Sequence, residues 1–399
     1  MFAMKNILII CLVALLFGCK QTEYKALIVT GQNNAHAWEE SHPILKKIIE
    51  NTGLFQVDVA ISPKKGENMS TFSPEFKKYD VVVMDYDGDM WAPDTRKNFE
   101  QYVKNGGGVI VYHAANNPFP EWKEYNKITG LGGWGNRNEQ SGPYLRWVDG
   151  APKKMYNPGP GGSHGDRHAY VLTTRNEEHP IMKGFPKRWR HVRDELYAEL
   201  RGPAENVEVL ATAYSAPKTR GTGFHEPMLF TVKYGKGRVF HTTLGHVGVD
   251  DFIATQCAGF IYTLQRGAEW AASGKVTQPV PEDMPNVAIP LLLPGFKQYT
   301  LEKLFALARK YEVGKSEKPL SLIAERIRKT KGDTGKIKEF EKQIIKLLED
   351  EKATTASKNY FCRELSWMGS QQAVPSLEKL AKNPATKEMA EYALFRLKK

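Results

Sequence analysis

The segment from Gly106 to Ala115 constrains the fold of this chain more than any other. It reads Gly-Gly-Gly-Val-Ile-Val-Tyr-His-Ala-Ala, so a run of β-prone apolar residues stands between a glycine turn and His113. Such a run is typical of a strand that is buried on both faces of a parallel sheet. Because open α/β sheets bind ligands at the carboxyl ends of their strands, the segment predicts that His113 lies at the mouth of a cleft.

Strands and helices alternate before this segment. Residues 25–30, 55–61 and 79–84 are β-type runs. Helical spacing of apolar residues predicts helices over 39–52 and 94–104. This alternation predicts an α/β fold with a doubly wound, mostly parallel sheet that helices cover on both faces.

The middle of the chain has a different texture. Residues 130–165 are rich in Gly, Pro, Trp, Tyr and Asn and predict long loops over the sheet. Regular structure is expected again in four strands and one helix, at residues 169–173, 207–213, 228–234, 237–243 and 251–271. The α/β domain is therefore expected to span residues 25–275.

The last part of the chain is expected to be helical. A Pro-rich linker over residues 276–296 precedes a small all-helical domain over 297–399. Its Leu, Ile and Ala spacing suits antiparallel helix pairs, and residues 372–381 resemble the first helix of a HEAT-like repeat. These helices are expected to offer a surface to a protein partner.

The N-terminus has the features of an export signal. Lys5 precedes an apolar run that ends at Gly18 and Cys19, and this run is too short for a comfortable membrane span. A small residue directly before Cys19 resembles a bacterial lipobox. The expectation is a lipoprotein signal over residues 1–18, a lipid on Cys19, a tether over 19–24, and export to the periplasmic face or the cell surface.

Charge and cysteine content exclude several other classes of protein. The formal net charge is +11, but the basic residues are scattered rather than gathered in a stripe, which argues against nucleic-acid binding. Apart from Cys11 in the signal and Cys19 at the lipid site, only Cys257 and Cys362 remain, and they lie in different predicted domains. Neither a disulfide framework nor a cysteine metal site is supported.

Several motifs in order along the chain carry a family resemblance. They are His36 and Trp38 after the first strand, Val-Tyr-His113-Ala-Ala, Glu178-His179-Pro180-Ile181, Asp194-Glu195-Leu-Tyr197, and the stretch from Tyr234 to His246. Together they make residues 25 to about 273 resemble the ThuA-like family of trehalose-utilisation proteins. The resemblance implies the flavodoxin-like fold of class I glutamine amidotransferases, and a role in disaccharide catabolism through 3-keto sugars. Many members of the family are exported lipoproteins.

One residue separates this chain from the amidotransferases. They carry a cysteine nucleophile at the strand-to-helix turn where this chain has His113, so it is not expected to be a glutamine amidotransferase. Imidazoles titrate near neutrality, and His113 and His246 both follow predicted strands. We predict these two histidines and Glu195 as catalytic residues. The predicted substrate-binding residues are His36, Trp38, Asp85, Asp87, Asn116 and Asp194.

Three functions are compatible with these residues. The leading hypothesis is that the protein processes a glycoside, in particular a 3-keto sugar derivative, by histidine acid/base chemistry as a lyase, isomerase or hydrolase. The first alternative is a non-catalytic sugar-binding or scaffold lipoprotein. The second is metal-assisted hydrolysis, with a divalent ion held by His36, His113 and His246 or by the His164–His168 pair with Asp166. The leading hypothesis needs no metal and no other cofactor.

Overall fold

The computed structural model describes residues 24–249, 251–282, 284, 286–293, 295, 301–330 and 332–397. The chain forms two compact units, Met1–Lys297 and Gln298–Lys399. The predicted signal and Cys19 lie outside the described residues. None of the helices in the described part of the chain has the length and apolar character of a membrane span.

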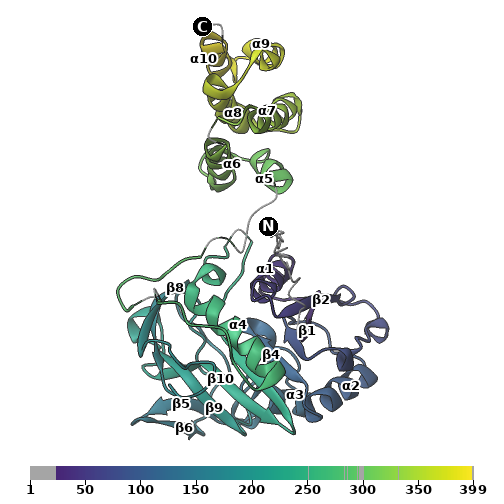
Figure 1. Cartoon of the computed structure of the whole chain (residues 1–399), viewed down its shortest axis with the longest axis vertical. Coiled ribbons are helices and arrows are strands. Elements are labelled where there is room, and N and C mark those ends of the chain that lie inside the picture. The colour runs from purple at the N-terminus through teal and green to yellow at the C-terminus, as the bar shows by residue number, and fades with distance from the viewer. Residues whose placement is uncertain are drawn as a thin grey trace, which may run out of the picture. The chain divides into compact units, whose positions relative to one another are not determined.

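The first unit is built on one mixed sheet of 11 strands (Figure 1). Its strand order is β2 (Phe55–Ile61), β1 (Tyr24–Thr30), β3 (Val81–Met84), β4 (Gly108–Tyr112), β11 (Gly237–Thr242), β10 (His225–Tyr234), β9 (Val207–Tyr214), β7 (His168–Thr174) and β8 (Arg188–Asp194). The first five run parallel, and the rest pair antiparallel. The α/β class is confirmed, and the antiparallel part is larger than the sequence suggested.

Two of the antiparallel strands lie where the sequence predicted only loops. Strands β5 (Tyr144–Val148) and β6 (Ala151–Met155) form a hairpin that joins the sheet through β10. Strand β6 is almost wholly exposed, so it has none of the apolar alternation that identifies a strand in a sequence. Its strand form follows from pairing with β5.

Helices cover both faces of the parallel part. Helix α1 (Trp38–Glu50) contacts α4 (Ala258–Ser273), and α4 packs on β4 and β11. Helix α2 (Pro93–Lys104) contacts α3 (Lys123–Thr129), and both also contact β11. Since the two helix pairs lie on opposite faces, the doubly wound arrangement is confirmed.

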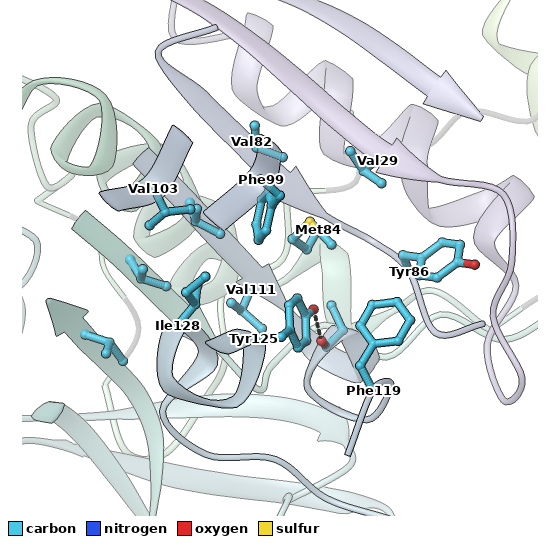
Figure 2. Close-up of a cluster of buried hydrophobic side chains, with 14 of the residues drawn as sticks. Val29, Val82, Met84, Tyr86, Phe99, Val103, Val111, Phe119, Tyr125 and Ile128 are labelled. Carbon is cyan, nitrogen blue, oxygen red and sulfur yellow. Dashed lines mark hydrogen bonds between the residues drawn. The ribbon is translucent and has the colours of Figure 1, made fainter. Parts of the chain in front are cut away.

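The core beneath α2 and α3 fixes the turn that follows β4. Val82, Met84 and Val111 project from the strands onto a cluster that includes Phe99 and Tyr125, and all are inaccessible to solvent (Figure 2). The hydroxyl of Tyr125 donates to the carbonyl oxygen of Ala115 at 2.6 Å. Packing of α3 therefore holds the residues directly after His113.

On the other face, α4 lies close against the sheet. A Cβ atom added to Gly267 would stand 2.1 Å from Cδ1 of Phe240 on β11, so only glycine permits this approach. Phe240 and Phe260 are both fully buried at this contact layer. The close packing fixes the end of β11, which leads to His246.

The second unit is helical in all its described regular structure, as the sequence predicted. It contains α5 (Leu301–Ala308), α6 (Lys318–Lys329), α7 (Thr334–Glu349), α8 (Thr355–Met368), α9 (Val374–Ala381) and α10 (Lys387–Leu397). Helix α5 packs on α6, α7 on α8, and α10 on both α8 and α9. The buried carboxylate of Glu341 accepts hydrogen bonds from the backbone N–H of Ser370 at 2.6 Å and from its hydroxyl at 3.0 Å.

Candidate functional site

His113 is held rigidly at the carboxyl end of β4. It opens a short 3-10 turn with φ of +46°, the left-handed region that a residue with a side chain rarely adopts. Its Nδ1 donates to the carbonyl oxygen of Thr243 at 2.6 Å, and its ring stacks on Tyr197 with centroids 4.5 Å apart. The side chain is 1% exposed. Because a carbonyl only accepts, Nε2 of a neutral His113 carries the lone pair.

His36 is positioned by the polar loop after β1. The side-chain oxygen of Asn33 accepts from the backbone N–H groups of Ala35 at 3.1 Å and His36 at 2.9 Å. The same oxygen lies 3.3 Å from Nδ1 of His36, which therefore carries the proton. Nε2 of His36 then faces Nε2 of His113 at a distance of 3.1 Å.

The buried carboxylate of Asp194 positions the backbone of Glu195 and His246 beside the other two histidines. Asp194, the last residue of β8, accepts hydrogen bonds at Oδ1 from the backbone N–H groups of Glu195 (2.8 Å) and His246 (3.1 Å). Its Oδ2 accepts from the N–H of Gly245 (2.8 Å) and from Nε2 of His191 (2.7 Å). Asp194 therefore ties the end of β8 to the loop after β11.

Glu195 is the centre of the resulting cluster. Its Oε2 lies 3.4 Å from Nε2 of both His36 and His113, and its Oε1 lies 3.2 Å from Nδ1 of His246. The four ligand-type atoms of His36, His113, Glu195 and His246 all lie within 4.8 Å of one another. Among the described residues this is the one group of three or more histidine, cysteine or acidic side chains with metal-binding proximity.

The surroundings shift the pKa values of His36 and His113 in opposite directions. Burial lowers the pKa of His36 to about 4. Burial also opposes the charged form of His113, but the adjacent carboxylate of Glu195 outweighs it, so the pKa of His113 is raised. Against its own burial, the surrounding imidazoles hold the pKa of Glu195 well below its usual range. The cluster thus holds an ionised carboxylate that attracts positive charge.

The cluster opens onto a pocket of about 480 Å³. His36 and Glu195 line it, whereas His113 and His246 lie behind them. Aromatic side chains from Phe119, Trp134 and Tyr197 form part of its wall. Apolar ring faces of this kind suit the C–H surface of a sugar ring, and the polar groups are confined to a few positions.

Asp87 lines the same pocket. Burial raises the pKa of this carboxyl to about 6, although hydrogen bonding to Asn34 and the charges of Arg137 and Lys65 oppose the shift. A carboxylate with a pKa near neutrality can act as a general base. The pocket therefore combines a proton acceptor with the cationic and acidic groups of the cluster.

The structure brings together only some of the residues that the sequence singled out. His36, His113, Glu195 and His246 meet, Asp194 supports them, and Asp87 lines the pocket. Trp38, Asp85 and Asn116 are not among the pocket-lining residues. Trp38 begins α1 and stacks on His42. The buried Asp85 accepts a hydrogen bond from the Ser41 hydroxyl at 2.6 Å. The side-chain nitrogen of buried Asn116 lies 3.0 Å from Nε2 of His241.

The second predicted metal arrangement does not form in the described structure. His164 lines the pocket, with its Nε2 3.9 Å from Oε1 of Glu195. His168 turns its Nδ1 to the carbonyl oxygen of Asp166, whose carboxylate pairs with Arg220 on the surface. The pair therefore does not converge on one point.

Sequence reasoning missed several residues of the pocket wall. Phe119, Trp134, Asn117 and Tyr197 line it, and the first two have positive φ values of +62° and +55°. Tyr197 stands in one of the family motifs but was not singled out as a site residue, and the signal of Phe119 and Trp134 was present but weak. Aromatic residues in Gly- and Pro-rich segments without periodicity are the expected lining of a loop-built pocket.

Comparison with known proteins identifies relatives of the α/β unit. The sequence profile of the ThuA family, described as trehalose utilisation, matches residues 25–271. A ThuA-like protein from Parabacteroides merdae ATCC 43184 is 52% identical, with a TM-score of 0.67, over 70% of this chain and 100% of that chain. One from Bacteroides uniformis ATCC 8492 is 21% identical, with a TM-score of 0.42, over 64% of this chain and 94% of that chain. No curated protein matches.

The family match covers the sheet from the second residue of β1 onward and all four residues of the cluster. It ends before the helical unit, which begins at Gln298. The chain therefore belongs to the ThuA family, whose description is trehalose utilisation.

Proposed function

We propose that this protein processes a glycoside, in particular a 3-keto sugar derivative, in the pocket formed by the ends of β1, β3, β4 and β8. The observation that carries the proposal is that His36 and Glu195 line a pocket together with the aromatic side chains of Phe119, Trp134 and Tyr197. Sugars bind such sites through ring faces and a few polar contacts. Membership of the trehalose-utilisation family supports a carbohydrate as the ligand.

The chemistry follows from the two polar ends of the pocket. A keto group makes the neighbouring C–H acidic, and Asp87 is the base that removes this proton. The negative charge then develops on the keto oxygen. His36 and Glu195 line the other end, where Glu195 raises the pKa of His113 and so keeps a positive charge close to this oxygen. In an isomerisation, Asp87 returns the proton to the former keto carbon while the proton of the neighbouring hydroxyl moves to the former keto oxygen. In an elimination, the keto group re-forms, the glycosidic C–O bond breaks, and Asp87 gives its proton to the departing oxygen.

The test is an assay of the full chain with 3-keto-trehalose and 3-keto-glucosides, followed by NMR. We expect conversion, and a fall of at least about 100-fold in kcat/KM for Glu195→Gln, because charge-stabilising and acid/base groups contribute about 10²–10⁴-fold. Glu177→Gln is the matched control, since Glu177 is an exposed carboxylate paired with Lys187. It should leave kcat/KM unchanged.

Two outcomes would contradict the proposal. One is that no keto-glycoside is converted, and the other is that Glu195→Gln matches the wild type. Sugar affinity that persists without turnover, and that survives replacement of both His113 and His246, would support a sugar-binding protein instead. Export and a lipid on Cys19 remain part of the proposal, and mass spectrometry of the mature N-terminus in the producing bacterium tests them.

A further inference from the structure

The contacts of His36 and His113 leave a set of acceptors facing one another. Nδ1 of His113 donates to Thr243, and Nδ1 of His36 faces the Asn33 oxygen that already accepts two backbone N–H groups. Each neutral ring then presents a bare Nε2, and the two lie 3.1 Å apart. The carboxylate oxygen of Glu195, 3.4 Å from both, is a third acceptor. Three acceptors in contact require a positive charge between them.

His246 adds a fourth ligand-type atom. Its Nδ1 is buried and, in the described structure, has no well-aligned hydrogen bond. Yet it lies 3.2 Å from Oε1 of Glu195. One proton on His113 would satisfy its contact with Glu195 but would leave Nε2 of His36 without a donor of its own. A single cation can be shared by all four residues.

The distances have the size that a small metal ion requires. Zinc binds imidazole nitrogen at about 2.0–2.1 Å in tetrahedral geometry, which places neighbouring ligand atoms about 3.3 Å apart. The separations of 3.1, 3.4 and 3.4 Å among His36, His113 and Glu195 agree with these edges. Imidazole ligands favour zinc and its transition-metal neighbours, whereas Mg²⁺ and Ca²⁺ prefer a shell of oxygen atoms.

We propose that Nε2 of His36, Nε2 of His113, Nδ1 of His246 and the carboxylate of Glu195 bind one divalent transition-metal ion of the zinc class. His36 and Glu195 face the pocket, so the pocket gives a ligand oxygen access to the ion.

The residues around the cluster behave as metal sites require. The carbonyl of Thr243 fixes the tautomer of His113, and Asp194 holds the backbone of both Glu195 and His246. The inference goes beyond the proposed function, because it rests on ligand geometry and holds whether or not the pocket takes a sugar. If the substrate is a 3-keto sugar, the ion acts as the Lewis acid for its keto oxygen.

The experiment uses the full chain, stripped with a chelator and then titrated with Zn²⁺ or Co²⁺ in a calorimeter. We expect one ion per chain, visible d–d absorption with Co²⁺, and a rise in Tm on binding. Glu195→Gln and His113→Ala should each weaken affinity at least tenfold, within the range for lost metal-site interactions. His168→Ala is the matched control, because this half-buried histidine lies outside the cluster.

Folding is checked by circular dichroism, and Glu195→Gln provides a near-isosteric change if His113→Ala fails to fold. Absence of stoichiometric binding, or equal weakening by His168→Ala, would overturn the metal site. Metal binding without turnover of keto-glycosides would support the metal site and refute the proposed reaction. Turnover by a metal-free protein that binds neither ion would support the proposed reaction and refute the metal site.

Discussion

Asp194→Asn addresses how the cluster is assembled. The Asp194 side chain is inaccessible to solvent and accepts four hydrogen bonds. Asparagine has nearly the same size and keeps one acceptor oxygen. If this oxygen takes the place of Oδ1, the amide NH₂ group takes the place of Oδ2 and meets the N–H of Gly245. Two donors then face each other in the interior, and the charge-assisted bond from His191 is weakened.

The size of the effect follows from these contacts. A buried donor left without an acceptor costs about 1–3 kcal/mol, and hydrogen bonds to a charged group contribute about 1.5–3 kcal/mol. We expect Asp194→Asn to lower the free energy of unfolding by about 3 kcal/mol. With an unfolding entropy of about 2.1 cal/mol/K per residue, this lowers the Tm of a unit that ends at Lys297 by about 5 °C.

Thermal unfolding followed by tryptophan fluorescence measures this change. Of the 8 tryptophans, only Trp367 lies in the helical unit, so the signal reports the α/β unit. Asp166→Asn is the matched control, because the Asp166 side chain is 55% exposed and its surface ion pair with Arg220 contributes about 1 kcal/mol at most. A shift below about 1 °C for Asp194→Asn, or an equal shift for the control, would refute the reasoning.

Three further outcomes are expected. Because Asp87 is active as the base when deprotonated, kcat/KM for a keto-glycoside should rise as the pH increases through about 6 and then level off. Asp87→Asn should abolish this rise in the pH–rate profile. Gly267→Val drives a side chain into the ring of Phe240 and should lower the free energy of unfolding in urea by about 1–3 kcal/mol. Gly295→Ala, which has open space around it, should leave this free energy almost unchanged. Glu341→Ala leaves both donors of Ser370 unpaired, and far-UV circular dichroism of the full chain should show destabilisation of the helical unit by about 2 kcal/mol.

The parallel half of the sheet was predictable because its strands are buried on both faces. Strands β3 and β4 are continuous apolar runs, and such runs identify both the strand and its carboxyl end. That is why His113 could be placed at the ligand edge. Asp85 also follows a strand, but its side chain turns inward and accepts a hydrogen bond from Ser41 on α1. The direction of a side chain at a strand end depends on contacts that no local pattern records.

Strand β8 was not predicted, although Asp194 ends it and Glu195 follows it. Its sequence, Arg-Trp-Arg-His-Val-Arg-Asp, buries a histidine and an aspartate that satisfy each other. Polar residues in such a pair break the apolar alternation by which strands are recognised. Glu195 was singled out through the family resemblance alone. The protonated nitrogens of His113 and His36 were equally out of reach, because they depend on the carbonyl of Thr243 and the amide of Asn33.

The four residues of the cluster come from opposite halves of the sheet. His36 and His113 follow the parallel strands β1 and β4, Glu195 follows the antiparallel β8, and His246 comes last in the chain. During synthesis, no nascent chain shorter than 246 residues can complete the constellation. Any ligand that needs all four side chains therefore binds only after the two halves have joined. Its binding energy is coupled to the folding of the whole α/β unit, and a truncation between the halves removes the complete binding site.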